Sequence, residues 1–111
     1  MTKVTISRKN GHIIRIECDG HTDYGVKGED IVCAALSSVV QTALLGLLTV
    51  AAIQPDYNVK DEEGYLSINI PDTLTDEQRK TADIILETMF MGVADLNEGY
   101  SDFVELTMLD K

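Results

Sequence analysis

The stretch GHTDYGVKGEDIVCAALS, residues 20–37, joins a glycine-rich connection to the start of a long apolar segment. Glycines and acidic residues supply turn formers throughout 19–29, and no core pattern runs through this part of the sequence. Asp30 is a preferred N-cap residue, and no charged residue follows it until after Pro55. The sequence therefore predicts a loop over 19–29, a cap at Asp30 and a helix to about Ile53, before the proline.

Two short segments before this loop alternate between apolar and polar residues, as half-buried strands do. They span residues 3–8 and 12–18, and Asn10-Gly11 lies between them. Asn-Gly is the strongest short signal for a hairpin turn because both residues tolerate positive φ. Arg15 and Glu17 would face away from the core, and the residues expected on the core face are Val4, Ile6, Ile14, Ile16 and Cys18.

The second half of the sequence repeats this pattern of a hairpin followed by a helix. Residues 57–60 and 65–70 predict a second hairpin across a short acidic turn that ends in glycine. The sequence Thr75-Asp76-Glu77-Gln78 is a capping-box pattern, which predicts a helix from there to about Asn97.

A further strand is expected over residues 101–109. The expected order is therefore β-β-α-β-β-α-β, an α+β fold in which a mixed sheet is packed with two helices. At 111 residues and 44% hydrophobic content, the sequence predicts a single domain, 1–111, with a core that needs no metal or disulfide.

The formal net charge of the sequence is −10 at pH 7. Binding to phosphate backbones depends on clustered Lys and Arg, so direct contact with nucleic acid is not expected. An acidic surface instead attracts basic partners over a distance. The two histidines and two cysteines fall in no zinc-ligand spacing, and no metal or other cofactor is expected.

Several features bear on where the protein resides. The N-terminal MTKVTI alternates like a strand and not like a signal peptide, and two cysteines without a CxxC motif are typical of reduced cytosolic thiols. The uncharged segment 31–55 has the length of a membrane span, but polar residues dilute it and no basic cluster flanks it. We expect a cytoplasmic protein without membrane contact, whose long helix is covered by the sheet and by a second helix or a partner subunit.

Cys33 places a soft nucleophile near the start of the predicted helix. The positive end of the helix dipole favours the thiolate, and the free amides of the first turn would stabilise a developing oxyanion. His21 follows the second strand and would act as a base if the hairpin returned across the helix start. Spacing alone leaves the alternative open that Cys33 is a buried structural cysteine and His21 a turn residue.

The order of motifs in this region is similar to that of a known family. Gly20-His21, a glycine-containing loop and Asp-Ile-Val-Cys-Ala-Ala-Leu-Ser over 30–37 resemble the signature of the ribosomal-processing cysteine protease family, Prp. The resemblance extends over the full chain in length, element order and acidic character. The sequence departs from the pattern at Thr22, where an alanine is common.

This resemblance implies a role for each of five residues. His21 would be the general base and Cys33 the nucleophile of a Cys-His dyad. Gly20, Asp30 and Ser37 would be supporting residues, with Asp30 as the helix cap. For Ser37, the alternative that a small residue permits close helix packing stays open.

The resemblance also implies a substrate and an assembly. Members of the family remove the N-terminal extension of a large-subunit ribosomal protein, number twenty-seven, and are homodimers. This chain would then be a cysteine endopeptidase that acts on an N-terminally extended basic ribosomal protein and supports ribosome assembly. One alternative is a non-enzymatic dimeric ribosome-associated binding module with an unreactive Cys33. Another is a thiol redox protein in which Cys18 resolves Cys33.

Overall fold

The computed structural model describes residues 1–20 and 29–111, with the backbone alone for Glu29, Asp30 and Asp61. Its elements follow the predicted order β-β-α-β-β-α-β, with a single short 3₁₀ turn added within the described residues. Their bounds are β1 (Thr2–Lys9), β2 (His12–Gly20), α1 (Glu29–Thr49), β3 (Asp56–Lys60), η1 (Asp61–Glu63), β4 (Tyr65–Asn69), α2 (Asp76–Gly99) and β5 (Val104–Asp110).

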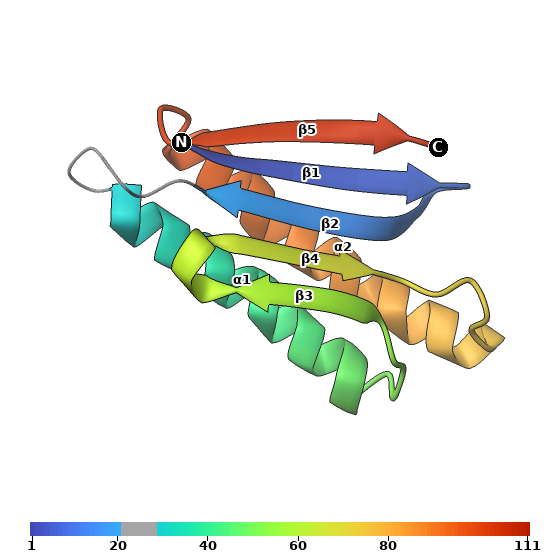
Figure 1. Cartoon of the computed structure of the whole chain (residues 1–111). Coiled ribbons are helices and arrows are strands. Elements are labelled where there is room, and N and C mark those ends of the chain that lie inside the picture. Colours follow the sequence, from blue (N-terminus) through green and yellow to red (C-terminus); the bar gives the residue numbers. More distant parts are fainter. Residues whose placement is uncertain (21–28) are drawn as a thin grey trace.

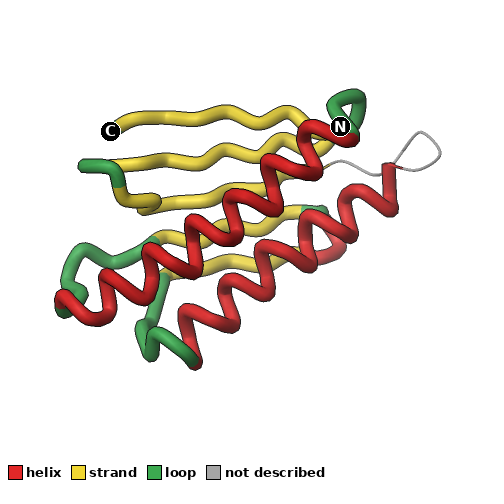
Figure 2. Tube along the Cα trace, turned by 180° about the vertical axis from the view of Figure 1, so that it is seen from behind, coloured by secondary structure: helices red, strands yellow, loops and turns green. Residues whose placement is uncertain are grey.

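The strands form a five-stranded sheet in the order β3-β4-β2-β1-β5. Neighbouring strands are antiparallel except β1 and β5, which are parallel, so the sheet is mixed as predicted. Figures 1 and 2 show both helices on the same face of the sheet, with the long axes of the helices side by side. The predicted α+β class and two-helix packing are therefore confirmed.

The first hairpin contains an irregularity that the alternating pattern did not predict. Its register shifts between Ser7 and Arg8, which leaves Ile14 as the extra residue of a β-bulge. Ile13 takes the core position, 1% exposed, and Ile14 is only half-buried. The prediction of Ile14 in the core was wrong because a strictly alternating pattern does not account for the extra residue of a bulge. The turn Asn10-Gly11 has positive φ at both residues, 54° and 82°, as predicted.

Helix α1 ends at Thr49, earlier than the predicted Ile53. Ala52 has a left-handed φ of 53°, and the amide of Ile53 donates to the carbonyl of Leu47 at 3.0 Å. This turn carries the Ile53 side chain into the core, where it is 3% exposed. The helix was predicted to end too far along the chain because apolar residues continue through the turn. Pro55 marks only the last position before which the helix could end.

Helix α2 begins with the predicted capping box. The amide of Gln78 donates to Thr75 Oγ1 at 3.1 Å, and the amide of Thr75 donates to Gln78 Oε1 at 3.0 Å. The helix continues past the predicted Asn97 to Gly99. Its buried stripe faces the sheet and consists of Ala82, Leu86, Met89 and Val93.

Helix α1 is apolar on its outer side as well as on the side that faces the sheet. Val32, Leu36 and Val40 are at most 2% exposed, whereas Ile31 is 74% and Leu45 is 60% exposed. By length and composition alone, α1 would pass as a membrane span, a test that core helices of soluble proteins also pass. Within the described residues, the sheet and α2 cover part of this helix and leave its outer side exposed.

Candidate active site around Cys33

Cys33 lies near the start of α1, at the end of the sheet where β2 finishes. The residue is half-buried, and its Sγ lies 3.3 Å from the point where a Cβ on Gly20 would stand. Figure 1 shows that the start of α1, the C-terminal end of β2 and the turn between β3 and β4 gather at this end of the sheet. The fold therefore brings the sulfur against the last residue of β2.

Gly20 is confined by its neighbours on two further sides. A Cβ at this position would lie 2.8 Å from Thr2 Oγ1, closer than real Cβ contacts allow. Its amide donates to the carbonyl of Gly64 at 2.9 Å, and Gly64 has a left-handed φ of 64°. A Cβ on Gly64 would collide with the carbonyl oxygen of Gly20. Glycine is required at both positions because two backbone segments approach each other beside the sulfur.

His21 follows Gly20 directly in the sequence and lies outside the described residues. The structure therefore contains no distance between His21 and Cys33, and the predicted dyad stays a prediction.

The predicted cap at Asp30 does not fit the helix bounds. Helix α1 already includes Glu29, so Asp30 belongs to the first helical turn by its backbone. The prediction was wrong because the acidic pair Glu29-Asp30 supports a first turn as readily as a cap, and the helix extends further towards the N-terminus. Acidic residues in a first turn still complement the positive end of the helix dipole.

Ser37 lies one helical turn after Cys33, as its spacing predicts. Its hydroxyl oxygen accepts a hydrogen bond of 2.6 Å from Nε2 of Gln41, one turn further along. The two side chains thus form a polar row along α1 that follows Cys33. The supporting role of Ser37 stays a prediction.

Cys18, on the core face of β2, differs from Cys33 in its surroundings. It is 6% exposed, which confirms the prediction of a small buried hydrophobic residue. Burial, and to a smaller degree Cys33 and Glu17, raise the pKa of the Cys18 thiol to about 12. Both cysteines are free. A thiol that stays protonated is a poor partner for thiol exchange, so this geometry does not favour the redox alternative.

Thr2 and Gly64 were missed as site residues in the sequence. They contact Gly20 from β1 and from the turn before β4, far away in the chain. Gly64 follows an acidic turn and could be expected to reverse the chain, but no local pattern shows which strand end it would meet. Tertiary packing alone brings these residues to Gly20, which lies beside Cys33.

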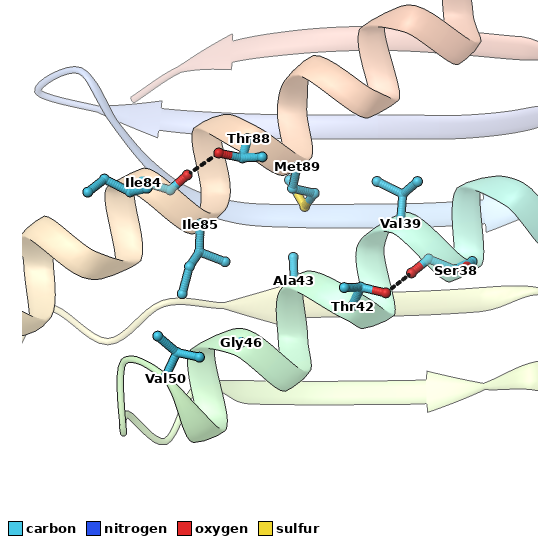
Figure 3. Close-up of a pocket in the computed structure, with 10 residues that line it drawn as sticks. All are labelled: Ser38, Val39, Thr42, Ala43, Gly46, Val50, Ile84, Ile85, Thr88 and Met89. Carbon is cyan, nitrogen blue, oxygen red and sulfur yellow. Dashed lines mark hydrogen bonds between the residues drawn. The ribbon is translucent and has the colours of Figure 1, made fainter.

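A groove of about 490 Å³ runs between the outer sides of α1 and α2. Figure 3 shows Val39, Ala43, Val50, Ile85 and Met89 among its lining residues, with hydroxyls at its edges. The groove begins beyond Ser37 and does not include Cys33. Within residues 1–20 and 29–111, no three His, Cys, Asp or Glu side chains gather closely enough to hold a metal ion.

Comparison with known proteins agrees with this arrangement. Residues 1–105 match the family model described as cysteine protease Prp. The ribosomal processing cysteine protease Prp of Bacillus subtilis is 28% identical over 108 residues, 96% of each chain. The protein of the same name from Staphylococcus aureus is 33% identical over 96 residues, 86% of this chain and 87% of the relative.

Solved structures share the fold. The crystal structure of S. aureus Prp with a substrate peptide superposes with a TM-score of 0.85 at 28% identity, and covers 97% of this chain and 99% of that one. A Streptococcus mutans protein reaches a TM-score of 0.87 at 25% identity, with 100% and 96% covered. The family model, the relatives and the half-buried Cys33 at the head of α1 lead to one conclusion: this chain is a cysteine protease and belongs to the Prp family of ribosomal processing proteases.

Proposed function

We propose that this protease removes the N-terminal extension of large-subunit ribosomal protein number twenty-seven, with Cys33 as nucleophile and His21 as general base. The observation that carries the proposal is the contact between the Cys33 sulfur and Gly20, the residue directly before His21. Membership of the cysteine protease Prp family, and the position of Gly20 beside the sulfur with His21 next in the sequence, together favour a Cys-His dyad.

The proposed reaction is acyl transfer. The Cys33 thiolate attacks the scissile carbonyl, and amides in the first turn of α1 stabilise the resulting oxyanion. His21 protonates the leaving amine as the peptide C–N bond breaks, which leaves an acyl-enzyme thioester. Water, deprotonated by His21, then attacks the thioester and releases the new C-terminal carboxylate and the Cys33 thiol.

Charge supports a basic substrate. With a formal net charge of −10, the enzyme attracts a cationic ribosomal protein in solution, and this attraction weakens as salt is added. The S. aureus relative has been solved with a covalently linked product peptide, which is the kind of adduct that a cysteine nucleophile forms.

We also propose that the protein is a homodimer in the cytoplasm, and that a second copy covers the groove between α1 and α2. Beside the groove, Leu45, Ile84 and Met91 are 60%, 63% and 66% exposed. Burial of such a patch in a self-complementary interface would remove apolar surface from water. Leu45→Glu should shift sedimentation towards the monomer, and Leu109→Glu on β5 should not. A monomeric wild-type protein would contradict the dimer.

The test of the cleavage is mass spectrometry of an extended ribosomal protein after incubation with the enzyme. We expect one cut, after the hydrophobic, aromatic-rich segment of the extension, by the wild type. His21→Ala and Cys33→Ala should each leave the substrate intact while circular dichroism shows an unchanged fold. Cleavage by either variant would overturn the proposed dyad, and an intact substrate with the wild type would overturn the proposed substrate.

A further inference from the structure

We propose that Thr2 is a positioning residue for the nucleophile, whose hydroxyl donates a hydrogen bond to the Cys33 thiolate when the charged form is present. The proposal rests on the proposed function in one respect, that Cys33 is the nucleophile. It assigns a task to a side chain on the first strand that the Cys-His dyad does not include.

The geometry places the Thr2 hydroxyl and the Cys33 sulfur around one point. Where Gly20 lacks a Cβ, Thr2 Oγ1 lies 2.8 Å from the position of that missing atom and Cys33 Sγ lies 3.3 Å from it. Both groups therefore border the space that only a glycine leaves open. The proposed hydrogen bond would form at this space when the sulfur is charged.

Backbone pairing on both sides holds Thr2 in place. It stands opposite Gly20 on β2 and opposite Val104 on β5, and its amide donates to the carbonyl of Phe103 at 2.8 Å. The residue is 3% exposed. A β-branched side chain has few rotamers, so its hydroxyl stays directed at the same place through the reaction.

The surroundings make an unused hydroxyl at this position unfavourable. Its neighbours on the same face of the sheet include Val4 and Val104, which are buried and apolar. Thr2 itself is buried beside them. A buried hydroxyl without a partner costs free energy, whereas a valine of the same shape would not. A Cys33 thiolate would be an acceptor for this hydroxyl, in a position where charge-assisted hydrogen bonds are strong.

The other titratable side chain known to interact with Cys33 on this side is Cys18 on β2. It is buried and stays neutral at physiological pH, so within residues 1–20 and 29–111 it neither accepts the Thr2 proton nor competes as an anion. The Thr2 hydroxyl is then a polar donor from β1 directed at the reacting sulfur.

The experiment compares Thr2→Val, which keeps the shape and removes the donor, with Thr2→Ser, which keeps the donor. Iodoacetamide labelling of Cys33 is followed against pH by peptide mass spectrometry, which needs no protease substrate. We expect the labelling curve of Thr2→Val to move up by about one pH unit, and that of Thr2→Ser to stay with the wild type. Thr5→Val, on the same strand but the opposite face, should change nothing.

Peptide cleavage gives the second measurement. Thr2→Val should lower kcat about tenfold with KM unchanged, since the hydrogen bond acts on the sulfur and not on the bound peptide. A Thr2→Val protein that labels and cleaves like the wild type overturns the proposal. If Thr2→Val fails to fold, Thr2→Ala must show the same shift or the proposal falls. A shifted labelling curve without cleavage of the ribosomal substrate by the wild type would overturn only the proposed function.

Discussion

The two cysteines of this protein lie close enough to influence one another, yet the fold gives them opposite characters. Cys18 sits in the middle of a strand with its side chain in the core, where the pKa of its thiol rises to about 12. Cys33 sits at the head of a helix, half-buried, with its sulfur against a glycine. The same side chain is a buried core residue in one place and the proposed nucleophile in the other, because solvent access and nearby backbone dipoles decide the reactivity of a thiol.

The largest expected effect separates the two cysteines by activity. Cys33→Ala should abolish cleavage of the extended ribosomal protein, since no other accessible thiol replaces it. Cys18→Ala should cleave at a rate within a few-fold of the wild type. Both rates are measured by mass spectrometry on the same substrate. A Cys18→Ala enzyme that is as inactive as Cys33→Ala would show that the two thiols act together.

The next effect tests the close approach beside Cys33. Gly20→Ala adds a Cβ that lies 2.8 Å from Thr2 Oγ1 and 3.3 Å from Cys33 Sγ, so the neighbours must move. We expect cleavage to fall by about a hundredfold, as a displacement of about 1 Å in an active site does. Gly99→Ala is the matched control, because nothing lies within 4 Å of a Cβ at that position. Equal activity of the two variants would contradict the crowded site.

The sequence predicts this fold well wherever local patterns carry the information. Alternating residues, the Asn10-Gly11 turn and the capping box at Thr75 are local signals, and the elements they predict are present. The bulge at Ile14 and the left-handed Ala52 were missed because an extra residue or a turn inside an apolar run leaves no local mark.

The site could be predicted only in part for a related reason. The position of Cys33 near a helix start could be predicted, because the acidic residues Glu29 and Asp30 directly precede the long apolar segment in the sequence. Thr2 and Gly64 belong to segments far from Cys33 in the chain, and only the packing of three strands and a helix brings them together. Tertiary structure decides which distant residues contact each other, and the spacing of residues along the sequence does not show this.

A smaller effect concerns the stability that the buried cysteine contributes. Cys18→Ala removes a sulfur from the core and should lower the free energy of unfolding by about 1 kcal/mol. Cys33→Ala should change it by less, because that side chain is only half-buried. Chemical denaturation at pH 7 measures both. A greater loss for Cys33→Ala would mean that the sulfur at the helix head packs as part of the core.

The smallest effect is the dependence of this stability on alkaline pH. In the unfolded chain the Cys18 thiol ionises near 9, and in the folded protein its pKa is about 12. Between these values the unfolded state holds fewer protons, so stability falls as pH rises, by about 1.4 kcal/mol per pH unit at most. Below pH 9 this group contributes no slope. Cys18→Ala should lack the extra decline above pH 9 in denaturation series, and an equal decline in both proteins would assign it to other groups.

The parallel pairing of β1 with β5 has a consequence for the order of events during synthesis. β1 lies between β2 and β5, and Thr2, its first residue, pairs with Val104. During translation, residues 104–110 are made long after β1, so one edge of β1 stays unpaired while the chain between them is synthesised. Contacts between such distant segments form late in folding. The strand that carries Thr2 thus gains its second neighbour only after β5 has been made.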